Sequence, residues 1–381
     1  MHPFFYYLQN KTQNNSIETG FLINRCFRYA FCLNFYVIMS QAGYTYSYRP
    51  RVAFYPTRRT SHYFDSGARV SPDMFVQRLH LEEIDEEYEA WNHITQEGLW
   101  GAELYPDFPW IEAMLGIPIE ASKEGYRLVS SEDQTSRRAY PSFDSKNPWI
   151  EGYFRMLKSA AYHAQGRYPL AIPSIKGILS LATVFFGESQ IQSWVKTCPD
   201  TLKKAIDKTI EFIIRFYQNV FSIIQNIEGK YTTGSSFLPF DIPCVVIQES
   251  LFNLDWIRNL NPLGEFINVM KKDLGYAFYL KISAPSLRWI DTLAILKLVD
   301  GVIVEKDETG FPWEDMVPLL QGIQEEGKVL VIAGYPAMED WKFLLQNLCY
   351  QDLIILFYVA TFQEAQFWSN YLSENSRRKA Q

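Results

Sequence analysis

The sequence lacks the clustered cysteine and histidine residues that hold metals or build disulfide frameworks. Its five cysteines form no CxxC pair and stand at no ligand spacing from any of the five histidines. A zinc site needs several such ligands close together, so no metal site is expected. Few and scattered cysteines in a chain of this length are typical of a reducing compartment. The sequence therefore predicts a cytoplasmic protein without a metal or other cofactor. The cysteines are Cys26, Cys32, Cys198, Cys244 and Cys349.

Basic residues are too few for a general nucleic-acid-binding protein. There are 36 Lys and Arg against 43 Asp and Glu, a net charge of -7. Binding to nucleic acid without sequence preference needs a dense basic face. No GxGxxG or GxxxxGK[ST] loop follows a predicted strand, which disfavours a nucleotide site of those kinds. We expect a small-molecule substrate and no nucleic acid, and leave a homodimer open.

A membrane span is not expected either. The apolar stretch at residues 21–38 is interrupted by Arg25 and Arg28. Each arginine at the centre of a membrane helix costs about 2.5–3.5 kcal/mol. Residues 1–38 are interpreted as an irregular extension, a weak interfacial helix, or translated sequence upstream of a true start at Met39. The barrel domain described below is assigned to residues 39–375.

Aromatic residues are abundant, with 10 Trp, 24 Tyr and 27 Phe making up 16% of the chain. Together with a hydrophobic content of 48%, they supply enough apolar surface for a large core. We expect most of these rings to be buried and a minority to line a pocket for a flat ligand.

Short apolar runs alternate with longer periodic stretches after a first helix, which begins at Ser71-Pro72 and runs to about Gln96. This alternation predicts a parallel sheet covered by helices. The fold class is α/β, a (β/α)8 TIM barrel with an N-terminal arm and helix, and an open doubly wound sheet is the alternative. The expected strands are 99–105, 168–172, 242–248, 277–282, 301–305, 329–333 and 353–359, with the eighth at 126–129 or 52–55. The expected helices are 199–224, 285–298, 313–326, 338–348 and 362–373.

The residues at the carboxyl ends of these strands are the candidate site residues, because a barrel carries its chemistry there. Tyr105 and Asp107 follow one predicted strand, Gln248 and Glu249 end another, and Lys281 lies near the end of a third. A strand-end lysine can bind a carboxylate or act as an acid. It can equally be a rim residue whose stem packs while its amine reaches water.

Three segments resemble the uroporphyrinogen decarboxylase superfamily, a group of TIM barrels that includes tetrapyrrole decarboxylases and corrinoid-linked methyltransferases. They are YAFYLKISAPSLRWIDTL with VDGVIVEKDETGFPWEDMVPLLQGIQEEGKVLVIAGYP, then YPLAIPSIKGILSLATVFFGE, and VVIQESLFNL. The resemblance covers about Pro50 to Trp368. It implies a barrel with its site at the strand ends.

Asp107 is the residue that the resemblance assigns most directly. In the decarboxylases an aspartate ends a strand nine residues before a glycine, and in LYPDFPWIEAMLG Asp107 precedes Gly116 by nine. A carboxylate at this point would stabilise the cation formed when a pyrrole ring is protonated. The alternative is that Asp107 only caps the short helix that follows it.

The sequence departs from the family at two places. The arginine-rich opening loop of the decarboxylases is replaced by an arm in which Arg58 and Arg59 could hold carboxylates or form a solvated turn. Where zinc-dependent relatives place histidine and cysteine, this chain has Lys281 and Ser283. The resemblance therefore does not extend to zinc activation of a thiol.

The resemblance implies a metal-independent carboxy-lyase acting on an anionic tetrapyrrole or a related polycarboxylate. Asp107 and Lys281 would be catalytic, and the substrate would be held by further side chains. Those substrate-binding candidates are Tyr105, Trp110, Arg58, Arg59, Gln248 and Glu249. A corrinoid-linked methyltransferase relative and a non-catalytic barrel that binds a tetrapyrrole or a partner are the alternatives.

The scatter of histidine and cysteine generates the first testable prediction. The purified full chain is expected to contain no stoichiometric zinc, because no set of soft ligands is available to hold it. Elemental analysis before and after treatment with a strong chelator measures this. Stoichiometric zinc that survives mild chelation would contradict the prediction.

Overall fold

The computed structural model describes residues 51–56, 60, 63–129, 140–234, 236–249, 262–287, 294–306, 312–335 and 338–379. Residues from Pro50 onward belong to one compact unit. The expectations for residues 1–38 and for a start at Met39 lie outside the described residues.

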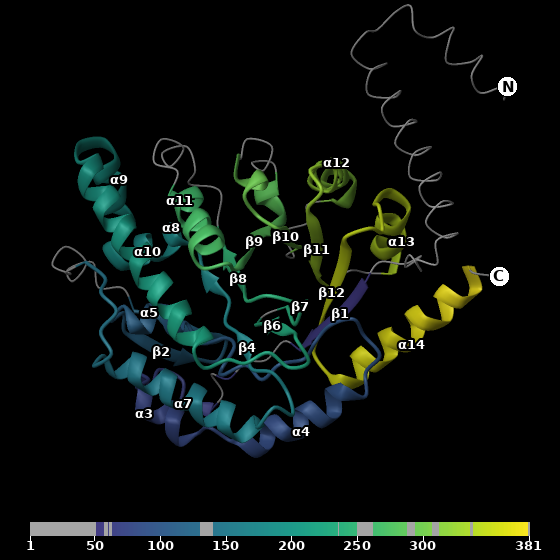
Figure 1. Ribbon diagram of the computed structural model, residues 1–381, viewed down its shortest axis with the longest axis horizontal. Helices are drawn as coiled ribbons and strands as arrows, with labels where there is room; N and C mark the ends of the chain where they lie inside the picture. The colour runs from purple at the N-terminus through teal and green to yellow at the C-terminus, as the bar shows by residue number, and fades with distance from the viewer. Residues whose placement is uncertain are drawn as a thin grey trace, which may run out of the picture. The chain divides into compact units, whose positions relative to one another are not determined.

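Seven parallel strands form the central sheet, in the order β1-β12-β11-β10-β9-β8-β5. Most of their side chains are buried on both faces, because helices cover the outside and the barrel core fills the inside. Figure 1 shows α11, α12 and α13 along the outer side of the strands. The strands are β1 (Arg51–Pro56), β5 (Ile175–Lys176), β8 (Cys244–Gln248), β9 (Ala277–Ser283), β10 (Gly301–Glu305), β11 (Val329–Gly334) and β12 (Leu353–Val359).

A bent segment, not a regular strand, runs from the β1 edge of this sheet to the chain at residues 169–171. The backbone N–H of Glu97 donates to the Val52 carbonyl over 2.8 Å, and Ala102 exchanges backbone hydrogen bonds with the 169–171 segment. The backbone comes so close to its neighbours at Gly101 that an added Cβ would lie 2.3 Å from a Thr232 methyl group. The chain thus has a (β/α)8 barrel fold whose predicted strand at 99–105 is replaced by one isolated bridge, between Ala102 and Leu170.

The eighth strand lies in the arm, the second of the two places considered. β1 pairs in parallel with β12 over its whole length. The other place, near 126–129, forms β3 (Gly125–Leu128), which pairs antiparallel with β2 (Ile119–Ser122) outside the barrel sheet. A third small sheet contains β4 (Ala171–Ile172), β6 (Tyr231–Thr233) and β7 (Pro239–Phe240).

The helices follow the sequence pattern except for two of those predicted. The expected helix after Ser71 is broken into α3 (Pro72–Gln77) and α4 (Leu81–Asn92). Within the predicted helix at 285–298, the described residues 294–297 form a 3-10 turn. The pattern did not single out α7, α8 or α9. The remaining helices are α5 (Trp110–Met114), α7 (Pro148–Ala164), α8 (Ile178–Phe186), α9 (Glu188–Thr197), α10 (Pro199–Phe221), α11 (Pro262–Asn268), α12 (Trp313–Glu325), α13 (Met338–Asn347) and α14 (Phe362–Lys379).

A cluster of aromatic rings joins the N-terminal helices to the segment that precedes the candidate site. Phe75 on α3 is fully buried, and its ring contacts Tyr105, Phe108 and Trp110 with centroid distances of 4.3–5.2 Å. Such aromatic pairs are worth about 0.5–1.5 kcal/mol each beyond the area they bury. This packing confirms that many of the aromatic residues belong to the core. In the described part of the chain, no helix is both long and apolar enough to cross a membrane.

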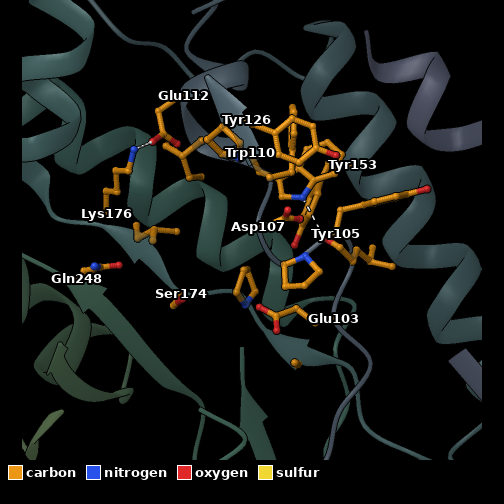
Figure 2. Close-up of a pocket in the computed structure, with 18 of the residues that line it drawn as sticks. Glu103, Tyr105, Asp107, Trp110, Glu112, Tyr126, Tyr153, Ser174, Lys176 and Gln248 are labelled. Carbon is orange, nitrogen blue, oxygen red and sulfur yellow. Dashed lines mark hydrogen bonds and ion pairs between the residues drawn. The ribbon is translucent and has the colours of Figure 1, made fainter. Parts of the chain in front are cut away.

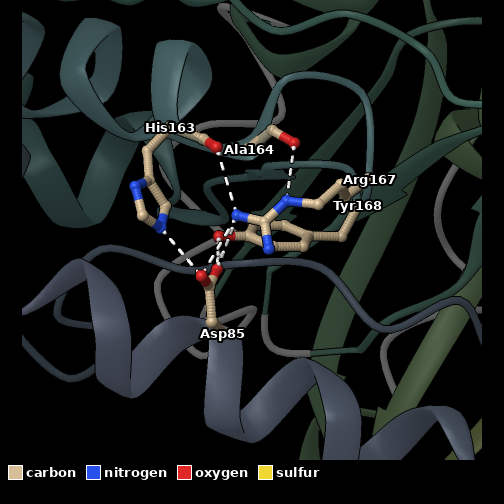
Figure 3. A network of polar contacts seen from close by, with 5 residues as sticks. All are labelled: Asp85, His163, Ala164, Arg167 and Tyr168. Carbon is tan, nitrogen blue, oxygen red and sulfur yellow. Dashed lines mark hydrogen bonds and ion pairs between the residues drawn. The ribbon is translucent and has the colours of Figure 1, made fainter.

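A polar network ties α4 to the chain that enters β4 (Figure 3). The Asp85 carboxylate accepts hydrogen bonds from Tyr168 over 2.7 Å and from Arg167 over 2.9 Å, and it contacts His163 at the end of α7 over 3.1 Å. Burial alone would raise the pKa of Asp85. The hydrogen bonds from Tyr168, Arg167 and His163 outweigh that effect, so the pKa lies below its ordinary value.

The Asp85 network generates the second prediction. A carboxyl whose pKa is lowered on folding stabilises the protein above its unfolded pKa, and this contribution is lost as the pH falls through the folded pKa. Asp85→Asn is expected to lower the free energy of unfolding at pH 7 by about 1–2 kcal/mol. It should also flatten the loss of stability below about pH 4. Urea denaturation from pH 3 to 7 tests both, with the exposed Glu86→Gln as control. Equal stability of Asp85→Asn and the parent at pH 7 would contradict the prediction.

Candidate functional site

A cavity of about 310 Å³ opens at the carboxyl ends of β5, β8 and β9. The loop at 102–109 and the first turn of α5 form its other wall. Figure 2 shows Lys176, Gln248 and Ser174 on one side of the cavity, and Tyr105, Trp110 and Tyr126 on the other. The position matches the end of a barrel at which catalytic residues are found.

The pairing of the strands places three hydrogen-bond donors in one row. Lys176 is the register partner of Gln248, and Gln248 is the register partner of Lys281. Partner residues on neighbouring parallel strands point to the same face of the sheet, with the strands about 4.8 Å apart. Two lysine ammonium groups and one side-chain amide therefore line the same wall.

Lys281 belongs to a partly buried cluster with a phenol and a carboxylate. Its residue is 6% exposed, and its Nζ donates to the Tyr358 hydroxyl over 3.0 Å and lies 3.1 Å from Glu305 Oε1. The Tyr358 hydroxyl donates to the same carboxylate oxygen over 2.6 Å. Burial and then the Glu305 charge hold the pKa of Tyr358 well above its usual range. The phenol therefore stays protonated at neutral pH and can donate a hydrogen bond.

Tyr358 was not identified as a site residue from the sequence, although the alternation of side chains along its strand indicates that it faces the barrel interior. It ends the period-two series Ile354, Leu356, Tyr358, in which alternate residues face the same side of β12. Tyr358 is the register partner of Tyr55 on β1, whose hydroxyl donates to Glu103 over 2.9 Å. The polar interior of the barrel therefore continues from β9 across β12 to β1.

Asp107 lines the cavity and also anchors the arm that follows β1. Its carboxylate accepts hydrogen bonds from the backbone N–H of Thr60 over 2.8 Å and from the Thr60 hydroxyl over 2.5 Å. Because the Thr60 proton is directed at Asp107, the Tyr126 hydroxyl donates to Thr60 Oγ1 over 3.0 Å. The N-cap of α5 is Pro109 and no side chain caps the helix, so Asp107 does not serve as the cap. Its catalytic role stays a prediction.

Tyr105 and Trp110 line the same cavity, and the polar atom of each side chain donates a hydrogen bond to a backbone carbonyl. The Tyr105 hydroxyl donates to the Phe75 carbonyl over 2.9 Å, and the Trp110 indole N–H donates to the Leu104 carbonyl over 3.0 Å. Tyr105 has φ of 50°, a left-handed conformation that is unusual for a bulky residue. Burial raises the pKa of its phenol. Both residues present ring surface to the cavity, and their role in substrate binding stays a prediction.

Glu249 is placed differently from Gln248. It is 2% exposed and does not line the cavity. Its carboxylate lies against Gly177, where an added Cβ would clash at 1.8 Å, and accepts a hydrogen bond from Ser180 over 3.3 Å. This puts a negative charge at the N-terminus of α8, where the helix dipole favours it. Arg58 and Arg59 lie outside the described residues.

A second ion pair, not expected from the sequence, lies at the far end of the donor row. Lys176 Nζ is 2.6 Å from Glu112 Oε1, and the Glu112 side chain is 4% exposed while that of Lys176 is 45% exposed. A buried carboxylate needs such a counter-charge. Each lysine of the row is thus held by its own carboxylate.

The described residues offer no metal centre at this site. No group of three or more His, Cys, Asp or Glu side chains within those ranges is arranged to hold an ion. The described cysteines Cys198, Cys244 and Cys349 are all free. The donors that line the cavity are ammonium, amide, phenol and carboxylate groups.

The dual contact of Asp107 generates the third prediction. Asp107→Asn removes a charged acceptor from Thr60 and is expected to lower the free energy of unfolding by about 1–3 kcal/mol. Thr60→Val keeps the backbone N–H but loses the hydroxyl, and should cost about 1 kcal/mol. Chemical denaturation of both variants measures this, with the exposed Glu124→Gln as control. An Asp107→Asn protein as stable as the parent would show that the contact does not stabilise the fold.

No protein-family model and no curated protein sequence matches this chain. Among solved structures, the chain is similar to a methyltransferase from Methanosarcina mazei, with a TM-score of 0.55 and 13% sequence identity. The likeness covers 85% of this chain and 94% of that chain. At this identity it establishes the barrel fold alone.

Proposed function

We propose that this protein is a methyl-transferring barrel enzyme that acts on a small molecule bound in the cavity. The observation that carries the proposal is the buried Lys281 ammonium, hydrogen-bonded to Tyr358 and paired with Glu305 at the carboxyl ends of the strands. Chemistry in this fold is located at that end. The likeness to a methyltransferase over most of both chains favours methyl transfer over decarboxylation.

The chemistry of methyl transfer explains why an ammonium and a phenol would be useful. When a methyl group leaves a heteroatom of the substrate, the electron pair of the broken bond stays on that heteroatom. A proton donor at this point stabilises the developing charge, as zinc does where thiolate and histidine ligands hold it. Lys281 supplies a positive charge and N–H donors, and Tyr358 orients the ammonium. The Glu305 carboxylate lies 3.1 Å from the Lys281 Nζ and balances its charge.

A corrinoid, which the resemblance suggests as methyl carrier, does not fit the cavity that the described residues form. Its volume of about 310 Å³ is near the lower end of about 300–1,000 Å³ for pockets that hold drug-sized ligands, and a corrin macrocycle is larger than such ligands. A corrinoid would have to be presented from outside the barrel. We assign it no residues and no step.

Two observations weigh against decarboxylation of a tetrapyrrole. The cavity that the described residues form is small for the macrocycle, for the same reason. The Asp107 carboxylate, which would have to face the pyrrole N–H groups, already accepts two hydrogen bonds from Thr60. Product analysis after incubation with uroporphyrinogen under reducing conditions tests this alternative directly, and release of a decarboxylated product would overturn our proposal.

The fourth prediction concerns Lys281. Lys281→Met keeps the length of the side chain and removes its charge, and is expected to lower methyl transfer by about 10²–10³-fold. Transfer is measured from a panel of small methylated amines, ethers and thioethers to free cob(I)alamin, by the change in visible absorption.

The matched control is Lys271→Met. Lys271 also pairs with a carboxylate, with Nζ 2.6 Å from Asp300 Oδ1, but this pair lies at the amino end of β10. Residues at the amino ends of barrel strands contribute to stability and not to catalysis. The Lys271→Met variant should therefore be less stable than the parent and keep its turnover. Equal loss of activity in the two variants, or no transfer by the parent from any donor, would refute the proposed role of Lys281.

A further inference from the structure

We propose that the cavity binds a small zwitterion. Its carboxylate would lie against the row of Lys176, Gln248 and Lys281, and its ammonium group against the opposite wall with Asp107 and the aromatic rings. The proposal concerns binding alone and goes beyond the proposed function, because it places the carboxylate at Lys281 and the ammonium group across the cavity from it.

The donor row suits a carboxylate because it offers charge and direction together. Lys176, Gln248 and Lys281 are successive register partners on β5, β8 and β9, so all three side chains approach the cavity from one wall. An ammonium has three N–H donors and an amide has two. Lys176 keeps two donors beyond the one directed at Glu112, and Lys281 keeps one beyond those directed at Tyr358 and Glu305. A carboxylate placed over Gln248 would therefore have donors on both sides.

The opposite wall suits a cation. Asp107 lies there beside Tyr126 and Trp110, and Figure 2 shows these side chains facing the cavity across from Lys176 and Gln248. A carboxylate can accept about four hydrogen bonds, and Asp107 uses two for Thr60. Aromatic faces attract ammonium groups, with the effect largest when water is excluded. Methylated ammonium groups are the cations that such rings bind best.

The balance of charge decides between the possible ligands. The carboxylates and ammonium groups that line the cavity within the described residues are three and two in number, with the lysines on one wall and Glu112 paired with Lys176: Glu103, Asp107, Glu112, Lys176 and Lys281. A ligand that is only anionic would meet an acidic wall, and one that is only cationic would meet the lysine row. A ligand with both charges satisfies both walls and adds no net charge. The cavity of about 310 Å³ limits it to a small molecule.

The experiment compares three probes by isothermal titration calorimetry on the full chain. Trimethylglycine carries both charges, acetate carries the carboxylate alone, and tetramethylammonium carries the cation alone. Trimethylglycine is expected to bind about tenfold or more tightly than either single-charge probe, because it engages both walls. Failure of trimethylglycine to bind, or binding no tighter than acetate or tetramethylammonium, would overturn the proposal.

Two variants test the orientation of the ligand. Gln248→Leu replaces an exposed amide at the centre of the row, and should weaken trimethylglycine about tenfold while leaving tetramethylammonium unchanged. The double variant Lys176→Gln with Glu112→Gln removes the whole ion pair, so no buried charge is left without a partner. It should have the same selective effect. Lys196→Gln, an exposed position on α9, is the control and should bind like the parent. Unchanged trimethylglycine affinity in both test variants would overturn the orientation.

The test separates this inference from the proposed function. If trimethylglycine binds with the expected selectivity and no methyl group is transferred from any donor, the ligand class stands and the proposed function fails. If the protein transfers methyl groups from an uncharged donor and binds no zwitterion, the proposed function stands and this inference fails.

Discussion

The parallel hydrogen-bond register of the seven strands is the constraint on which the site depends. Because side chains alternate along a strand, a shift of one residue would turn the interior set outward against the helices. In the register observed, Gln248 pairs with Lys281, and Glu305 pairs with Ser283 on one side and Ala333 on the other. Tyr358 reaches the same interior from β12. The polar cluster is therefore a consequence of backbone pairing as much as of residue type.

Asp107 connects the stability of the fold with the geometry of the site. It holds Thr60, which follows β1, and it lines the cavity at the same time. The strand β1 is joined to β12 on one side and bridged to Glu97 on the other. A single carboxylate thus fixes the distance between the arm and the cavity wall. The left-handed backbone of Tyr105, two residues earlier, belongs to the same turn.

Two lysine–carboxylate pairs at opposite ends of the barrel show how position decides the use of one residue type. Lys271 with Asp300 ties the π-helical turn after α11 to the start of β10, and Asp300 also accepts the backbone N–H of Phe278. These contacts join parts of the scaffold, and none of the residues involved lines the cavity. Lys281 with Glu305 lies where the strands end and a cavity opens, so the same chemistry becomes available to a ligand. Sequence alone does not separate the two pairs.

The sequence by itself determined the barrel class and most of its strands. Buried parallel strands have short apolar runs in the sequence, and the helices between them have a periodic pattern of apolar residues. It also pointed to Asp107, Gln248 and Lys281, since a strand end is visible in the pattern. It did not reveal the partners of Asp107 and Lys281, because Thr60 and Tyr358 lie far from them along the chain. Nor did it show that Glu249 points into α8 while its neighbour faces the cavity. Those contacts were decided by tertiary structure, because strand register and the curvature of the sheet bring together side chains whose spacing in the sequence carries no information about their distance in space.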